Sequence, residues 1–242
     1  MFTKAINFSL LYSSIQHIFF DLDNTLWDFE TNSQKVLHEL IQKHGLISKC
    51  QCSDRSFIKT YVLVNDDLWA RYRKNLISKE ELRSSRFYNT MLYFGYEDRE
   101  LGLQLEKEYI DNSPYQKELF PHTLETLDYL SSKYKLHIIT NGFAEIQHIK
   151  LKNCSIDQYF NEVLISEQIG FNKPHPNIFN AALEKTSAKT EHALMIGDDW
   201  DADIIGASEA GFKTIFFNPR KKMVNSNQTP EIQSLNELIT LL

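Results

Sequence analysis

Cysteine is scarce in this sequence, and its scarcity excludes one class of protein. The chain of 242 residues has three cysteines, Cys50, Cys52 and Cys154. An odd and sparse set cannot form a disulfide framework, and the Cys50–Cys52 pair has no second pair with which to complete a zinc site. Free thiols are typical of a reducing compartment, so the sequence predicts a cytoplasmic protein.

Long apolar runs and an excess of basic residues are also missing. No apolar run approaches the ~20 residues that span a bilayer. Residues 1 to 15 contain one lysine, a broken apolar segment and no clear cleavage site, so we expect an N-terminal extension rather than a signal peptide. The net charge of −6 argues against a nucleic-acid polymer or an anionic membrane as partner. A small phosphorylated metabolite stays compatible, because a metal ion or one lysine can reverse the sign locally.

Five short apolar runs predict a parallel sheet. They are continuous rather than alternating, as in strands that are covered on both faces. Helical segments separate the later runs, which predicts a doubly wound, Rossmann-like α/β sheet. The predicted strands are residues 17–21, 135–140, 161–166, 192–198 and 213–218, and the predicted helices are 144–153, 176–187, 201–211 and a closing one at 230–242.

More than one hundred residues separate the first two predicted strands, far too many for a simple crossover. Apolar residues recur there at helical spacing in four segments, which predicts an inserted all-helical cap. Gly45 and Gly95 are predicted helix stops, and Ser78 with Glu81 resembles a capping box. The predicted organisation is a core of residues 1–28 and 114–242 and a cap of residues 29–113. A helical lid of this kind excludes water and selects substrates.

Asp21 ends the first predicted strand, and a second carboxylate, Asp23, follows two residues later. If the extended conformation continues past residue 21, Asp21 and Asp23 face the same side. Asp198, at the end of another run, adds a third acidic group. Like charges this close repel unless a cation or a shared proton intervenes, and oxygen ligands suit Mg²⁺. The alternative for the Asp21–Asp23 pair alone is that both cap a turn.

Further polar residues stand at other strand ends. Thr140 offers a hydroxyl, and Asn141 opens a loop whose backbone N–H groups suit an anion. Lys173 lies just before a predicted helix, where its charge can neutralise a phosphate or a carboxylate. Of the aspartates that follow residue 197, Asp198 is the best ligand candidate, with Asp199 and Asp203 behind it. Asp201 is expected to serve only as a helix N-cap or as a partner of the helix dipole.

As a set, these residues resemble the motifs of the haloacid dehalogenase (HAD) superfamily: Asp21-Leu-Asp-Asn-Thr25, Thr140, Lys173 and Gly197-Asp198 with Asp203. The position of the insert resembles the subfamily with a type-1 cap. The resemblance covers nearly the whole chain beyond the N-terminal extension.

A looser resemblance lies inside the insert. Asn65, Trp69, Tyr72, Arg86 and Phe87 are similar to positions of the YjjG/YfnB-type branch, which includes pyrimidine 5′-nucleotidases. This resemblance makes Trp69, Tyr72 and Arg86 candidate substrate contacts. The alternative for Trp69 and Phe87 is packing in the core of the cap.

The resemblance implies a role for each motif. Asp21 is the nucleophile that forms an aspartyl-phosphate, and Asp23, oriented by Thr25, is the general acid and base. Thr140, the Asn141 amide and Lys173 hold the phosphoryl group. Mg²⁺ is held by Asp21, the Asp23 carbonyl and Asp198, with Asp203 or Asp199 completing its ligands. His175 departs from the family pattern, where many relatives have aspartate, and is expected to be a loop or helix-cap substitution.

Several activities share this scaffold. The implied function is Mg²⁺-dependent hydrolysis of small phosphomonoesters, with nucleoside 5′-monophosphates as the expected substrates. A phosphosugar mutase, or a phosphatase of phosphoglycolate, sugar phosphates or flavin mononucleotide, stays open. A 2-haloacid dehalogenase is a more distant alternative, since it needs neither Asp23 nor a metal. A binding module on an inactive scaffold would need a broken site, yet every expected residue is present.

Overall fold

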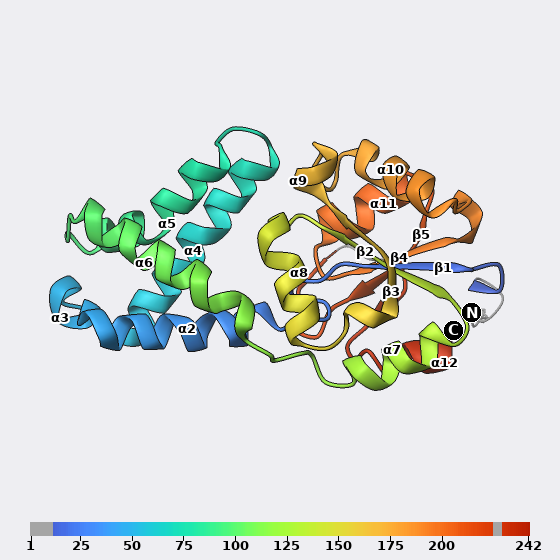
Figure 1. Ribbon diagram of the computed structural model, residues 1–242, viewed down its shortest axis with the longest axis horizontal. Coiled ribbons are helices and arrows are strands. Elements are labelled where there is room, and N and C mark those ends of the chain that lie inside the picture. Colours follow the sequence, from blue (N-terminus) through green and yellow to red (C-terminus); the bar gives the residue numbers. More distant parts are fainter. Residues whose placement is uncertain (1–11, 225–228) are drawn as a thin grey trace, which may run out of the picture. The chain divides into compact units, whose positions relative to one another are not determined.

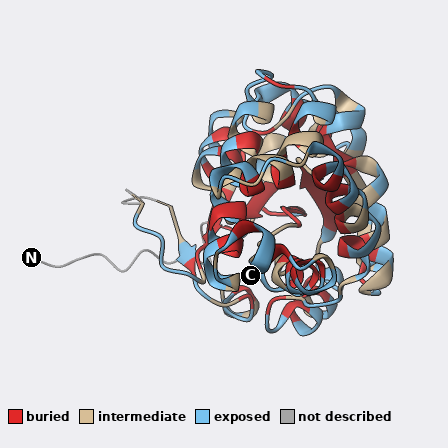
Figure 2. Cartoon of the chain, turned by 90° about the vertical axis from the view of Figure 1, so that its left-hand side faces the viewer, coloured by how far each residue is buried: buried red, intermediate tan, exposed pale blue. Residues whose placement is uncertain are grey.

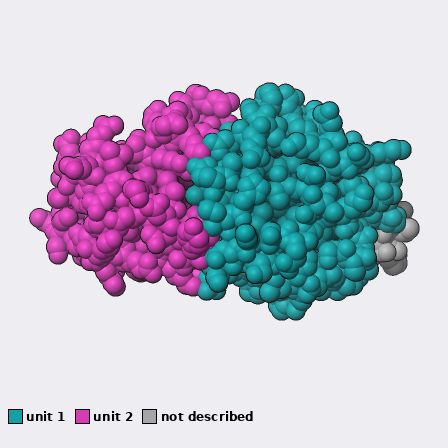
Figure 3. All heavy atoms as spheres, in the orientation of Figure 1, with its two compact units in different colours: residues 1–28, 117–242 teal, residues 29–116 magenta. Residues whose placement is uncertain are grey.

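A computed structural model describes residues 12–224 and 229–242. The predicted N-terminal extension lies mostly outside these residues. The chain divides into two compact units, residues 1–28 with 117–242 and residues 29–116, coloured separately in Figure 3. Within the described parts of the chain, no helix combines the length and the apolar character needed to cross a membrane.

The first unit is built on a parallel sheet with the strand order β3-β2-β1-β4-β5-β6. The sequence predicts a doubly wound α/β sheet, and the structure confirms it. The strands are β1 His17–Phe20, β2 Lys135–Thr140, β3 Phe160–Ile165, β4 Ala193–Gly197, β5 Lys213–Phe217 and β6 Glu231–Ile232.

Helices cover both faces of this sheet. In Figure 1, α10 and α11 lie on one face and α7 and α12 on the other. The α-helices in the described part of the unit are α7 Thr123–Ser131, α8 Ala144–Asn153, α9 Ser166–Ile169, α10 Pro176–Thr186, α11 Gly206–Glu209 and α12 Glu237–Leu241, and the π-helical turn is η4 Trp200–Ile205. Figure 2 shows buried strands beneath helices whose outer faces are exposed. The strands are buried because their side chains pack against helices above and below.

Two predicted helices differ in the structure. The predicted closing helix at 230–242 is wrong in its first part, where β6 pairs with β5 and only Glu237–Leu241 is α-helical. β6 is too short for hydrophobic periodicity to separate it from a helix. The predicted helix at 201–211 begins with a π-helical turn, Trp200–Ile205, before α11. Such turns often mark functional sites.

The second unit is all helical. Its helices are α2 Phe29–His44, α3 Leu46–Cys50, α4 Asp54–Arg73, α5 Lys79–Tyr93 and α6 Arg99–Asn112. Gly45 and Gly95 follow α2 and α5 with φ of 61° and 78°, and Ser78 caps α5 by accepting a hydrogen bond from the Glu81 amide, which confirms the predicted stops and cap. Phe87 is fully buried in the apolar core of this unit, so packing explains it.

Candidate active site

The candidate site lies where the sheet changes its direction of growth. β2 and β3 follow β1 on one side, whereas β4 to β6 lie on the other side. Ligands of open α/β sheets bind at such a switch point, beyond the carboxyl ends of the strands. Asp21 follows β1 and Asp198 follows β4, and the Asp21 amide donates a hydrogen bond to the Ile196 carbonyl at 2.9 Å.

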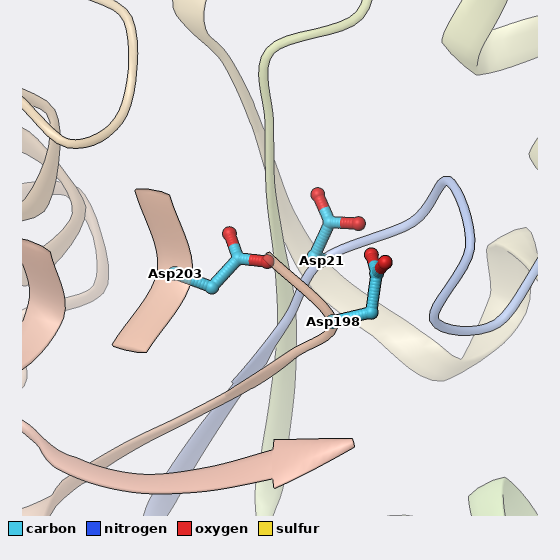
Figure 4. A group of neighbouring side chains, drawn as sticks. All are labelled: Asp21, Asp198 and Asp203. Carbon is cyan, nitrogen blue, oxygen red and sulfur yellow. The ribbon is translucent and has the colours of Figure 1, made fainter. Parts of the chain in front are cut away.

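Three carboxylates meet at this edge. One oxygen from each of Asp21, Asp198 and Asp203 lies within 4.8 Å of the others, and Figure 4 shows the three groups around a common space. Gly197 makes the arrangement possible, because a Cβ atom there would lie 2.2 Å from Asp203 Oδ2. Three converging carboxylates fit a hard divalent cation such as Mg²⁺, which prefers oxygen ligands.

Burial makes these carboxylates costly to ionise. It raises the pKa of Asp21 well above its usual range; Asp203 and Asp198 add to the shift, and Lys173 opposes it. Burial also raises the pKa of Asp198 to about 6, against the effect of Lys222. A bound cation would favour the ionised forms, so the electrostatics of the cluster match the metal that its donors suit.

Lys173 is the cation at the centre of the site. It is 2% exposed, and its Nζ lies 2.6 Å from Asp21 Oδ1, 2.6 Å from Asp203 Oδ1 and 2.7 Å from the Ile139 carbonyl. Burial alone would lower its pKa, but Asp203 and Asp21 outweigh burial and raise it. Lys173 is therefore held charged against the predicted nucleophile.

The loop that carries Lys173 is held by the side chain of Asn141. Asn141 Oδ1 accepts from the Lys173 amide at 2.7 Å, and Nδ2 donates to the Lys173 carbonyl at 3.0 Å. The sequence assigned a role only to the Asn141 backbone. His175 caps α10 by accepting from the Asn177 amide, which confirms its predicted role as a cap.

Thr140 ends β2 with its hydroxyl already oriented. Its Oγ1 accepts from the Gly142 amide at 3.0 Å and from Gln147 Nε2 at 2.7 Å. A hydroxyl oxygen has two lone pairs and one O–H. With both lone pairs occupied, the O–H is available for donation to an anion.

Asp23 lies just beyond the end of β1 and directly before a turn at residues 24–26. β1 ends at Phe20, and the Leu22 carbonyl accepts from the amides of residues 25, 26 and 27. Asp23 also pairs with Trp27 in an isolated β-bridge, and an extended conformation past residue 21 stays a prediction. Asp23 Oδ2 accepts from Gln147 Nε2 at 2.8 Å, and Oδ1 lies 2.6 Å from Lys150 Nζ.

Sequence reasoning missed Gln147 and Lys150. They stand three residues apart in the helix that follows Thr140 and Asn141, so they share one face of it. That spacing, in a helix that leaves the edge where ligands bind, was the available signal.

Thr25 and Asp199 have different surroundings from those expected. Thr25 is fully buried, and its Oγ1 has no hydrogen-bond partner within the described structure, Asp23 included. Asp199 Oδ1 accepts from the amides of Asp201 and Ala202 and so caps the π-helical turn. Asp201 lies in the first turn of this segment and is not its cap, so of its two expected roles only that of a partner of the helix dipole fits. Asp203 lies with Asp21 and Asp198, whereas Asp199 does not belong to that cluster.

The candidates in the helical unit divide into two kinds. Trp69 and Tyr72 are half-buried and contact each other edge to face, with centroids 5.6 Å apart. Arg86 is 4% exposed and forms a two-pronged ion pair with Glu106. It also donates to Asn65 Oδ1 at 3.4 Å. The contacts of Arg86 lie within the core of its own unit.

Lys222 is a further basic residue at the site. Its Nζ lies 3.0 Å from Asp198 Oδ2. The Asn218 side chain holds its backbone, accepting from the Lys222 amide at 2.8 Å and donating to its carbonyl at 3.0 Å. Both residues line a hollow with Asn24 and Arg220.

The fold and this constellation place three acidic side chains and a buried lysine at the switch point of a doubly wound α/β sheet. The sequence matches the haloacid dehalogenase-like hydrolase family over residues 18–217, and the chain belongs to this family. This confirms the resemblance described above.

Individual relatives refine the comparison. The chain is 31% identical to the pyrimidine 5′-nucleotidase PynA of Streptococcus pneumoniae, over 93% of this chain and 94% of that protein. It is also 31% identical to a glyceraldehyde 3-phosphate phosphatase of Methanothermobacter thermautotrophicus, over 84% and 86% of the two chains. The crystal structure of the HAD-hydrolase YfnB from Bacillus subtilis, bound to magnesium, matches with a TM-score of 0.84 and 28% identity. The match covers 94% of this chain and 98% of that chain.

Proposed function

We propose that this protein is a Mg²⁺-dependent phosphatase that hydrolyses small phosphomonoesters through an aspartyl-phosphate intermediate. Its preferred substrates in this proposal are nucleoside 5′-monophosphates. The observation that carries the proposal is the buried Lys173 ammonium between Asp21 and Asp203, with Asp198 alongside. Phosphoryl transfer needs positioning and neutralisation of charge, and this arrangement supports both.

In the first step the Asp21 oxygen that Lys173 does not hold attacks phosphorus. The bond from phosphorus to the ester oxygen breaks, and Asp23 gives its proton to that oxygen as it leaves. Thr140 donates its hydroxyl to a phosphoryl oxygen. In the second step Asp23 takes a proton from water, the water oxygen bonds to phosphorus, and the bond to Asp21 breaks to release phosphate.

Asp21, Asp198 and Asp203, with the Asp23 carbonyl, would hold Mg²⁺. When bound, the ion neutralises developing charge on the phosphoryl group. The three carboxylates argue against a dehalogenase, which needs no metal. The free thiols of Cys50, Cys52 and Cys154 agree with a reducing, cytoplasmic location.

The test compares metal-depleted protein with and without added Mg²⁺ on p-nitrophenyl phosphate. We expect phosphate release only with Mg²⁺, and Asp21→Asn should abolish it without changing the circular dichroism spectrum, because the nucleophile is lost. The absence of Mg²⁺-dependent turnover on every phosphomonoester would refute the proposal. Interconversion of sugar phosphates without net phosphate release would favour a mutase.

The substrate class is tested by a panel. The nucleotidase relative supports UMP, dUMP and dTMP as preferred substrates, whereas the glyceraldehyde 3-phosphate phosphatase relative supports a small sugar phosphate. We expect the highest kcat/KM on a pyrimidine nucleotide. A higher value on glyceraldehyde 3-phosphate, phosphoglycolate or flavin mononucleotide would overturn that preference but not the phosphatase activity.

A further inference from the structure

Two buried polar side chains of α8 have no role in the mechanism described so far. Gln147 is 0% exposed and Lys150 is 4% exposed. Glutamine and lysine are rarely buried this fully without partners, because burial of a polar or charged group costs free energy. The partners of both residues belong to the candidate active site.

Gln147 links the predicted acid to the predicted phosphate-binding hydroxyl. Its Nε2 donates one hydrogen to Asp23 Oδ2 at 2.8 Å and the other to Thr140 Oγ1 at 2.7 Å. In this contact the carboxyl oxygen accepts, so the amide presents its nitrogen and not its oxygen to Asp23. Its Oε1 is buried without a hydrogen-bond partner among the described residues, and the two donated bonds outweigh that cost.

Lys150 holds the other oxygen of the same carboxyl group. Its Nζ lies 2.6 Å from Asp23 Oδ1 and 4.1 Å from the centroid of the Trp27 ring. Trp27 is fully buried, and its backbone forms a bridge with that of Asp23. The lysine is therefore confined between the indole and the carboxyl group.

We propose that Gln147 and Lys150 are positioning residues, which hold Asp23 for proton transfer to the leaving oxygen and, through Gln147, turn the Thr140 hydroxyl toward the phosphoryl group. The inference rests on the phosphatase function proposed above. The two bonds occupy one lone-pair site on each Asp23 oxygen and leave a second site on each. These remaining sites are where the proton for the leaving oxygen would bind.

Gly142 supplies an independent structural argument. A Cβ atom at this position would lie 2.2 Å from Gln147 Nε2 and 2.4 Å from its Cδ. The glycine therefore leaves the space that the Gln147 amide occupies. Gly142→Ala displaces that amide without removing a polar side chain, so it tests the same contact by another route.

The experiment compares two leaving groups. p-Nitrophenolate departs without a proton, whereas the alkoxide of a nucleoside monophosphate needs one. The parameter is kcat/KM, which covers the steps up to formation of the aspartyl-phosphate and so excludes the later use of Asp23 as a base. Lys150→Met is the main variant, and Lys152→Met, an exposed lysine of the same helix, is its matched control.

For Lys150→Met we expect kcat/KM on the nucleotide to fall about tenfold to a hundredfold, since a well-placed general acid contributes 10²–10⁴-fold, with little change on the aryl phosphate. Gln147→Met and Gly142→Ala should lower kcat/KM on both substrates, because the Thr140 hydroxyl also loses its orientation, and more on the nucleotide. Lys152→Met should behave like the unaltered protein. Circular dichroism and the thermal midpoint monitor the fold of each variant.

If kcat/KM falls by the same factor on the two substrates in folded Lys150→Met and Gly142→Ala, the positioning role is overturned. An unchanged or increased kcat/KM on the nucleotide in these variants would also overturn it. If Lys150→Met does not fold, the comparison is decided by Gly142→Ala. An unaltered protein that hydrolyses no phosphomonoester would instead refute the phosphatase function itself. The two failures are therefore distinguishable.

Discussion

At the scale of single residues, the neighbours of each carboxylate decide its chemistry. Asp21 and Asp203 share the ammonium of Lys173, whereas Asp198 faces Lys222 and Asp23 faces Lys150. Each acidic group of the site thus has a basic partner. The partners differ in exposure, because Lys173 and Lys150 are buried and Lys222 is half exposed.

Lys222 offers a prediction about metal affinity. Its ammonium lies 3.0 Å from Asp198 Oδ2, so it competes with any cation bound by that carboxylate. Lys222→Met should tighten Mg²⁺ binding by up to about fivefold, since a partly exposed ion pair is worth about 0–1 kcal/mol. Calorimetric titration of metal-depleted protein measures the change. Lys221→Met is the control, and equal or weaker binding in Lys222→Met would contradict the competition.

At the scale of elements, β1 and β2 enclose a histidine pair away from the carboxylates. His17 Nδ1 and His137 Nε2 are 3.0 Å apart on adjacent parallel strands, and His137 is 1% exposed. Its Nδ1 is buried without a hydrogen-bond partner among the described residues. Burial, with smaller effects of His17 and Lys135, lowers the pKa of His137 to about 3.

This pair predicts how stability depends on pH. The unfolded chain binds a proton on His137 near pH 6.5, whereas the folded chain does not. The contribution of neutral His137 to the free energy of unfolding is fully present above that pH and is lost as the pH falls from 6.5 toward 3. Between pH 7.5 and 5.5 the loss is about 1.4 kcal/mol. Urea unfolding at both pH values measures the free energy of unfolding. Between them, His137→Gln should lose about 1.4 kcal/mol less of that free energy than the unaltered protein. The same loss in His137→Gln would contradict the prediction.

At the scale of the whole molecule, each of the two units has its own apolar core. The helical unit also contains the buried Arg86–Glu106 ion pair. The Cζ atom of Arg86 lies over the Tyr109 ring, 5.2 Å from its centroid. Asn65 adds a hydrogen bond to the same guanidinium. Since this charge pair is buried, removal of one partner leaves the other uncompensated.

We therefore expect Arg86→Met to destabilise the helical unit by about 3–5 kcal/mol. Hydrogen exchange should accelerate within residues 29–116 and change little in the α/β unit. Arg86→Met combined with Glu106→Leu should recover much of the loss, because no unpaired charge stays buried. Unchanged exchange with a raised KM would instead support the direct substrate contact that the resemblance suggests for Arg86.

The sequence by itself determined the architecture and the identity of the central groups. Continuous apolar runs mark strands covered on both faces. Asp21, Thr140 and Asp198 each stand at the carboxyl end of such a strand, so a parallel sheet brings them to the same edge. These features are local or periodic, so they can be read along the chain. Lys173 and Asp203 were predictable only as members of a set of motifs.

Only the tertiary structure decided which groups touch. Gln147 and Lys150 contact Asp23 across more than one hundred and twenty residues, and Lys173 contacts Asp21 across one hundred and fifty-two. No local pattern encodes such pairs, because they arise when strands and helices pack. The same reason explains why Arg86, a candidate substrate contact in the sequence, is a buried partner of Glu106.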